Sequence, residues 1–396
     1  MKKKFMFDIC LNIVSSAIPI GVLQVIVYPI LARKIGAENY GLMLTIYSLW
    51  MIISASLGNI LNNARLLMNE KYLSKNLEGD FNIVYTFCNI LNVAAVLFST
   101  WVYYGKFSSF NIFLSVIASV LILSKGYLSV GFRLNLNYKY VAIDSIMLSV
   151  GYLLGFILSY FTGFWELIFI FGYGLSYLFC ISKTTLLKEK RIKTELFPEV
   201  KMYIRSLGFS AVISSIVVYA DKIILYPLLG GYSVSVYSTA SIFGKVMDLM
   251  LRPITSVVLS YISKWKNDKN DILKRVLSIG ILIAVFGYFG VLILSKPIIC
   301  LLYPQWADDV VKLLPITTMT IMIRAIIGII DPFILKFCNI KWQSRIALIQ
   351  FVVYFISALT LYKFWGLIGF CFGTIIGKAV HLSILLWIYY FNSGRS

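Results

Sequence analysis

Long hydrophobic runs follow one another along almost the whole chain, from Ile9 to Tyr390, and only short charged connectors separate them. A helix of about 20 apolar residues crosses the ~30 Å hydrocarbon core of a bilayer. Lipid offers the backbone no hydrogen bonds, and a helix satisfies its own. Because 60% of the residues are hydrophobic and only 13% are charged, the sequence predicts an all-α polytopic membrane protein.

About twelve such runs occur, six on each side of a longer polar stretch. They lie near 9–31, 41–63, 81–104, 109–130, 141–162, 165–182, 206–229, 236–262, 276–296, 311–334, 346–362 and 367–391. The sequence therefore predicts an N-terminal six-helix bundle (1–182), a cytoplasmic linker (183–205) and a C-terminal six-helix bundle (206–396).

The two halves share a short motif. Val25–Leu31 and Ile223–Leu229 both place a Tyr-Pro pair between apolar residues, at the end of the first helix of each half. Halves with an even number of helices would be parallel repeats about an axis along the membrane normal, which is a transporter architecture.

The distribution of positive charge predicts the orientation. With a cytoplasmic N-terminus, the inner segments carry 24 of the 36 Lys and Arg residues and the outer connectors only six. This bias follows the positive-inside rule, and an even helix count puts both termini in the cytoplasm. The net charge of +19 therefore suits anionic lipid headgroups. No basic soluble domain is present to bind nucleic acid.

Two other readings of composition are set aside. Residues 1–30 carry three lysines before an apolar stretch, but that stretch is too long for a secretory signal and lacks a small-residue cleavage site. The six cysteines are scattered without metal-ligand spacing, so no metal site, disulfide framework or cofactor is predicted.

Several segments resemble one family. Tyr28–Gly41, in which an apolar helix ends in a basic residue, a glycine and a Tyr-Gly pair, resembles the first loop of polysaccharide exporters of the multidrug/oligosaccharidyl-lipid/polysaccharide (MOP) superfamily. Tyr219–Leu225, Tyr237–Pro253 and Leu361–Gly377 resemble their seventh, eighth and closing helices. Length and span number resemble the O-antigen or capsule repeat-unit flippases (the Wzx type). Leu302–Trp306 departs from the pattern, since the family commonly has a glycine near Pro304.

The resemblance implies a MATE-like fold and a flippase rather than an enzyme. Its substrate would be an undecaprenyl-pyrophosphate-linked oligosaccharide, moved across the bacterial inner (plasma) membrane by alternating access for lipopolysaccharide O-antigen or capsule synthesis. The implied partners are this lipid-linked substrate, membrane lipids, a polysaccharide polymerase and a chain-length regulator. No cofactor is implied, and H⁺ or Na⁺ coupling is the candidate driving force.

A diphosphate crossing the membrane needs a polar cavity with fixed positive charge, because its desolvation costs many kcal/mol. Charged residues inside spans are rare and usually functional. The predicted cationic cavity consists of Arg324, Lys245, Arg252, Lys222, Lys378 and, at the inner entrance, Arg65. Arg324 leads this set because a guanidinium suits bidentate phosphate binding.

The ion-coupling candidates are Asp221, Asp248, Asp331 and His381, with structural ion pairs or interface positions as the alternative for each. Adjacent helical residues point about 100° apart. Asp221 is therefore expected to pair with a cation on another helix rather than with Lys222.

Four further charges lie nearer the surfaces. Arg33 and Lys34 at the outer rim are candidates for product release or rim anchoring. Lys125 is expected to extend to the inner interface, and Asp144 to lie no deeper than the headgroups.

Two other function classes compete. A MATE-like drug/cation antiporter would need an acidic cavity, which the six basic residues within the spans argue against. A polysaccharide polymerase or ligase would carry a large outer loop with catalytic Arg or His, and the longest outer connector, Lys296–Val310, has neither.

Overall fold

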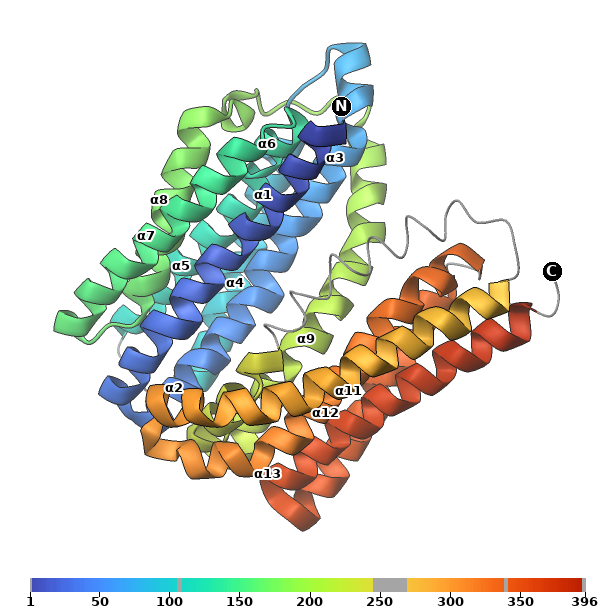
Figure 1. Cartoon of the computed structure of the whole chain (residues 1–396). Helices are drawn as coiled ribbons and strands as arrows, with labels where there is room; N and C mark the ends of the chain where they lie inside the picture. The colour runs from blue at the N-terminus through green and yellow to red at the C-terminus, as the bar shows by residue number, and fades with distance from the viewer. Residues whose placement is uncertain (1, 105–108, 245–268, 338–340, 394–396) are drawn as a thin grey trace. The chain divides into compact units, whose positions relative to one another are not determined.

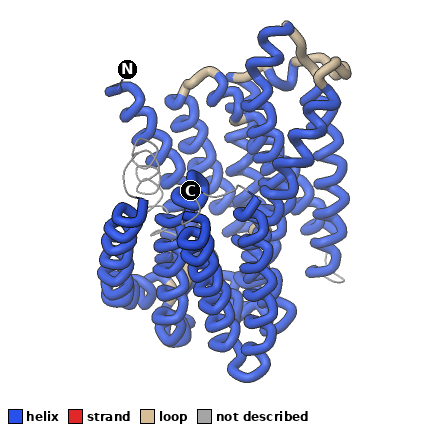
Figure 2. Tube along the Cα trace, turned by 90° about the vertical axis from the view of Figure 1, so that its right-hand side faces the viewer, coloured by secondary structure: helices blue, strands red, loops and turns tan. Residues whose placement is uncertain are grey.

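The computed structural model describes residues 2–104, 109–244, 269–337 and 341–393, and helices are the regular elements throughout these ranges (Figure 1). The helices are α1 (Lys2–Gly21), α2 (Tyr28–Trp50), α3 (Ser56–Lys75), α4 (Asp80–Tyr104), α5 (Ser109–Leu128), α6 (Val130–Leu134), α7 (Tyr138–Thr162), α8 (Glu166–Lys183), α9 (Phe197–Ala240), α11 (Lys269–Leu302), α12 (Ala307–Phe337) and α13 (Lys341–Ser393). Short π-helical segments, Val22–Val27 and Met51–Ala55, join the first three. Figure 2 shows loops only as brief connectors in the described chain, which confirms the all-α fold class.

The predicted hydrophobic runs fall on these helices. In the described part of the chain, eight helices are long and apolar enough to cross a membrane, or nine if the bent pair Phe197–Ile213 and Ser215–Gly244 is one span. Val14–Lys75 and Leu348–Ile388 are 62 and 41 residues long, and each holds two predicted runs. The run 236–262 is described only as far as residue 244.

Glycines interrupt the long helical stretches where two predicted runs meet. Gly36 has φ 77° and ψ 165°, and Gly230 has φ 77° and ψ 177°. Glycine adopts this left-handed backbone without the steric cost that a Cβ imposes. A Cβ built on Gly36 would meet no atom within 4 Å, so backbone conformation rather than packing requires this glycine. Both breaks follow the Tyr-Pro pair of the repeated motif within eight residues.

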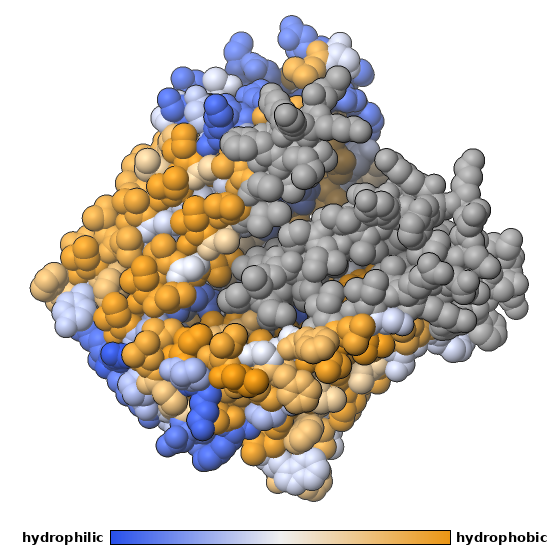
Figure 3. Space-filling model, in the orientation of Figure 1, coloured by the Kyte–Doolittle hydropathy of each residue, from blue (hydrophilic) through white to orange (hydrophobic). Residues whose placement is uncertain are grey.

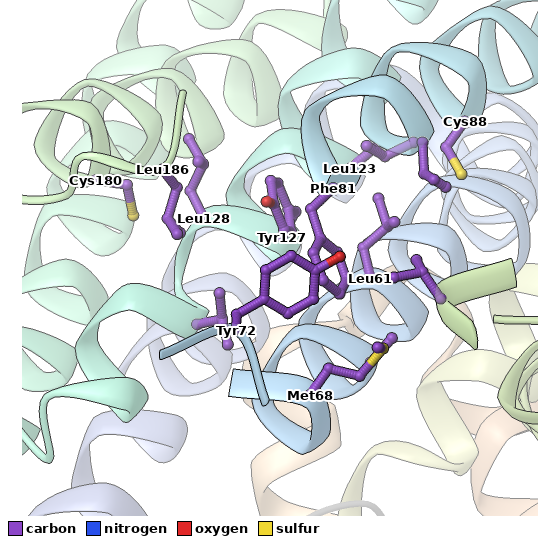
Figure 4. Packing of buried hydrophobic residues seen from close by; sticks show 14 of the residues in the cluster. Leu61, Met68, Tyr72, Phe81, Cys88, Leu123, Tyr127, Leu128, Cys180 and Leu186 are labelled. Carbon is purple, nitrogen blue, oxygen red and sulfur yellow. The ribbon is translucent and has the colours of Figure 1, made fainter. Parts of the chain in front are cut away.

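Contacts divide the chain into two compact units, Met1–Ile224 and Leu225–Ser396, with the boundary inside α9. The segment 183–205, expected to be a linker, belongs to the first unit. Its side chains Leu186, Leu196 and Val200 are buried in one hydrophobic cluster with Tyr72 and Phe81. Figure 4 shows Leu186 within this cluster. The connector is therefore packed into the first unit.

The sides of the first unit are apolar. Phe87, Ile90, Phe98 and Trp101 of α4 are each about 60% exposed or more. Figure 3 shows hydrophobic residues over this unit's flank and hydrophilic residues at its upper end. Such a surface matches a hydrocarbon layer bounded by headgroups, because water-soluble monomers rarely expose large contiguous apolar areas.

The second unit packs α12 against both parts of α13. Ile327 and Ile330 of α12 form a buried cluster with Ile346, Leu385 and Ile388 of α13. The break at Trp365 and Gly366 separates the two parts of α13 that supply these residues. This packing fixes the helices that carry Arg324, Lys378 and His381.

Candidate functional site

A buried ion pair lies within the first unit. Lys125 Nζ of α5 is 3.3 Å from Asp144 Oδ2 of α7, and the two side chains are 22% and 4% exposed. The other carboxylate oxygen of Asp144 accepts hydrogen bonds from Ser176 Oγ and, at 3.7 Å, from Cys180 Sγ, both on α8. Three helices thus meet at one carboxylate.

This pair corrects one prediction. Lys125 was expected to extend to the interface but turns to Asp144, which is 3% exposed. The physical reason is that an unpaired buried carboxylate costs several kcal/mol, whereas a lysine on a flexible stem can reach it. The long side chain of Lys125 therefore brings its ammonium group to Asp144 rather than to the membrane surface.

Aromatic side chains surround this region on α2, α7 and α8. The rings of Tyr152 and Tyr173 meet edge to face at 6.0 Å, and Tyr47 stacks on Phe169 at 4.5 Å. Tyr173 lies within electrostatic reach of Lys125, and Tyr152 within reach of Asp144. Phenol groups and an ion pair thus create a polar interior inside an otherwise apolar bundle.

Arg65, predicted at the inner entrance, is held by the connector. Its Nη2 and Nη1 donate to Glu189 Oε1 and Oε2 at 2.5 and 3.2 Å, and its side chain is 8% exposed. The guanidinium also lies 5.2 and 5.0 Å from the ring centres of Tyr72 and Phe81. Burial raises the pKa of the Glu189 carboxyl, and the charge of Arg65 opposes this shift. Arg65 could contact a substrate only by releasing Glu189.

A wider set of polar contacts fastens the same connector. Asp80 accepts hydrogen bonds from Tyr72 Oη at 2.6 Å and from the backbone N–H of Thr194 at 2.7 Å. Asn82 Nδ2 donates to the carbonyls of Leu186 and Glu189 at 3.0 and 2.8 Å. The connector is therefore tied to α3 and α4 at several points.

Asp221 and Lys222 pair with each other, which corrects the expectation of a partner on another helix. Lys222 Nζ is 3.6 Å from Asp221 Oδ1, and Lys222 is 5% exposed. The backbone N–H of Lys222 also donates to Asp221 Oδ1 at 3.0 Å. The side-chain directions differ as expected on a helix, but the lysine stem is long enough to bridge them.

The other interior candidates lie in the second half. Arg324 of α12 and Lys378 of α13 are half-buried. His381 is half-buried one turn after Lys378, and its Nδ1 atom is buried without a hydrogen-bond partner in the described chain. Asp331 lies on α12 at a position whose side chain is not described. Lys245, Asp248 and Arg252 lie outside the described residues.

The two outer-rim candidates, Arg33 and Lys34, lie next to the break at Gly36. Both residues are exposed. Lys34 Nζ lies 3.8 Å from the ring centre of Tyr160 on α7, a cation–π contact. This contact suits an anchoring role for Lys34.

Sequence reasoning missed the pairing of Asp144 with Lys125 and did not single out Glu189 or Arg133. A signal for the first was available. Lys125 and Asp144 lie a few residues from the inner ends of successive predicted runs, so antiparallel neighbours bring opposite charges to a similar depth. Glu189 had no comparable signal, because it lies in a connector whose course the sequence does not specify.

Comparisons with known proteins show which solved structures share this fold. No protein-family model matches the sequence, and no curated protein matches it either. Among solved structures, the lipid II flippase MurJ in an inward closed conformation aligns with a TM-score of 0.73 and 18% identity, over 99% of this chain and 86% of that one. A MATE-family multidrug resistance transporter of the MOP superfamily, inward-facing, aligns with a TM-score of 0.66 and 16% identity, over 97% and 98%.

The outward-facing conformation of a MATE-family transporter of the MOP superfamily aligns with a TM-score of 0.65 and 14% identity, over 98% of this chain and 96% of that one. The chain shares the fold of these transporter structures. The likeness extends over nearly the whole chain, so it includes both halves rather than one bundle. It confirms the MATE-like architecture predicted from the sequence. The MOP fold is shared by the flippase and the drug transporters and does not by itself select a substrate.

Proposed function

We propose that the protein is a flippase for undecaprenyl-pyrophosphate-linked oligosaccharide repeat units of the Wzx type, acting in O-antigen or capsule synthesis in the bacterial plasma membrane. The fold supports a transporter, and the protein of this fold that aligns with a TM-score of 0.73, MurJ, is a lipid II flippase. The polymerase and the chain-length regulator are proposed partners that would receive the product.

The observation that carries the proposal is the excess of basic residues in the predicted spans of the second half. The sequence has Lys245, Arg252, Arg324 and Lys378 in these hydrophobic runs, against Asp248 and Asp331. An excess of positive charge in a low-dielectric interior suits a diphosphate and disfavours a cationic drug.

The proposed cycle is alternating access, in which two bundles rock around a central cationic cavity while the polyprenyl chain remains in lipid. An H⁺ or Na⁺ gradient would drive it through a carboxylate that gains or loses a cation. Asp144 joins Asp221 among the candidates, because protonating either carboxylate would release a neighbouring lysine. The membrane potential contributes about 2.3 kcal/mol per charge per 100 mV, enough to bias such a cycle.

A MATE-like antiporter is the second candidate, since MATE transporters align almost as well as MurJ. One experiment separates the two functions. Proteoliposomes would contain a fluorescent prenyl-diphosphate oligosaccharide in one assay and a lipophilic cationic dye with a pH gradient in another. The proposal expects protein-dependent equilibration of the lipid between leaflets and no dye transport. Dye transport without lipid movement would replace the flippase by the antiporter.

A further inference from the structure

The side chain of Arg133 is held in place by neighbouring residues, at the predicted inner end of the first unit. Arg133 lies on α6, within the predicted inner connector 131–140, and its side chain is exposed. Its Nη1 donates to Asn62 Oδ1 of α3 at 2.8 Å. Asn62 is 4% exposed, so a buried amide orients an exposed guanidinium.

Asn62 is itself fixed. Its Nδ2 donates to the Gly126 carbonyl at 2.9 Å and to Ser129 Oγ at 3.1 Å. Each hydrogen of the amide group therefore has a partner, and its oxygen is left for Arg133. Beneath it α3 and α5 cross closely, since a Cβ on Gly58 would lie 3.2 Å from the Gly126 Cα. This close crossing holds the amide at a defined place.

The short helix α6 is anchored on its opposite side. Val130, Gly131 and Phe132 are buried, and the Phe132 ring contacts those of Tyr140 and Phe179 at 5.8 and 5.7 Å. Only Arg133 of this segment turns its side chain fully outward. Its position therefore follows from packed neighbours rather than from a free loop.

The charge of Arg133 is not cancelled. No ion pair involves Arg133 among the described residues, whereas Arg65, one turn after Asn62 on α3, is neutralised by Glu189. Four of the five guanidinium N–H groups remain for an outside acceptor. A planar fork of this kind matches phosphate oxygens.

An apolar residue lies beside this charge. Leu136 has φ 49°, a left-handed conformation that is unfavourable for leucine, and its side chain is 67% exposed. Its N–H donates to the Arg133 carbonyl at 3.1 Å. A cation next to an exposed leucine, at the inner end of a membrane protein, fits a ligand with a phosphate and a hydrocarbon chain.

We infer that Arg133, positioned by Asn62, binds the phosphate group of a membrane lipid, and that this lipid is the diphosphate-linked substrate entering from the inner leaflet. The inference rests on the proposed function for the substrate's identity. The shared chemistry, a phosphate ester on a hydrocarbon chain, could also come from a phospholipid headgroup. The experiment separates these two sources.

The test uses the purified full-length protein in detergent and two probes, geranylgeranyl diphosphate and a short-chain phosphatidylglycerol, with uncharged geranylgeraniol as blank. The variants are Arg133→Gln, Arg133→Lys and Asn62→Ala. Lys139→Gln is the matched control, because Lys139 is an exposed cation in the same connector. Affinity is measured by thermophoresis, and the melting temperature of each variant is recorded.

Arg133→Gln is expected to weaken diphosphate binding about tenfold, or about 1.4 kcal/mol, because a charge-assisted hydrogen bond is lost. Arg133→Lys should recover part of the affinity, because it restores the charge without the fork. Asn62→Ala should weaken binding about threefold with Arg133 intact, as expected when a cation loses its orientation. Lys139→Gln should change it less than twofold.

A loss confined to the diphosphate assigns the site to the substrate, and an equal loss for phosphatidylglycerol assigns it to bulk phospholipid and overturns the substrate part. Equal effects of Arg133→Gln and Lys139→Gln, or no effect of either, overturn the site altogether. If the wild-type protein binds the diphosphate and Arg133→Gln binds it equally, only this inference fails. If the wild-type protein neither binds nor translocates it, the proposed function fails.

Discussion

At the scale of single residues, three cations of the first unit each have a carboxylate partner. Lys125 with Asp144, Lys222 with Asp221, and Arg65 with Glu189 each bring a cation to a carboxylate. Buried pairs contribute little net stability against apolar replacements, but removing one partner is costly because the other charge remains. This asymmetry makes the pairs testable.

Asp144→Asn is expected to destabilise the protein by about 3 kcal/mol, because the partly buried charge of Lys125 would lose its carboxylate partner. The double variant Lys125→Met, Asp144→Leu should recover most of that loss. Thermal unfolding in detergent measures both. Lys75→Gln, in a pair whose side chains are 50% and 63% exposed, is the control and should leave the melting temperature unchanged.

The double variant also separates structure from coupling. Restored stability with lost gradient-driven transport would assign Asp144 a coupling role. Full transport in the double variant would limit the pair to packing, and an Asp144→Asn protein as stable as wild type would contradict the burial argument.

At the scale of elements, the long helical stretches depend on glycines whose backbone no other residue adopts cheaply. Gly36→Ala is expected to cost about 1 kcal/mol, because a Cβ opposes φ 77° even though the space around it is open. Gly21→Ala is the matched control, with φ −61° and equally open surroundings, and should be neutral or slightly stabilising. Equal melting temperatures for the two variants would mean that the break at Gly36 tolerates a side chain.

The connector 184–196 is the second element with a specific expectation. Arg65→Ala leaves Glu189 buried without its cation, so the connector should detach more often from α3 and α4. Trypsin applied to inside-out vesicles should then cut sooner at its exposed residues Lys188, Lys190 and Arg191. The Lys75→Ala protein should be cut at the wild-type rate. An unchanged rate for the Arg65→Ala protein would show that the ion pair between Arg65 and Glu189 does not hold the connector in place.

At the scale of the whole molecule, the sequence predicted the helices well. In lipid each hydrophobic run must satisfy its own backbone hydrogen bonds, and a helix does so. The breaks were foreseeable in kind, since Gly36 and Gly230 follow the repeated Tyr-Pro motif. The partners of Lys125, Arg65 and Asp221 were not, because pairing depends on depth and rotation between helices and on side-chain reach. The sequence analysis did not foresee the packing of Leu186 and Leu196, although their apolar side chains in a charged segment were an available signal.

The predicted orientation belongs to this scale as well. Single cysteines at Lys190 and at Lys363, in a background without the native cysteines, should react with an impermeant maleimide from opposite sides of the membrane. In right-side-out cells, Lys363→Cys should label and Lys190→Cys should label only after permeabilisation, since the basic connectors lie inside. The reverse pattern would invert the topology.

The central claim is that positive charge within the second half selects a diphosphate. The most direct measurement compares, in proteoliposomes, the transfer between leaflets of one fluorescent oligosaccharide carried on a prenyl diphosphate and on an uncharged prenyl ether. The diphosphate lipid should move at least about tenfold faster, the factor that 1.4 kcal/mol of preferential binding provides, and Arg324→Ala should reduce that ratio. Equal rates for the two lipids in the wild-type protein would contradict the claim.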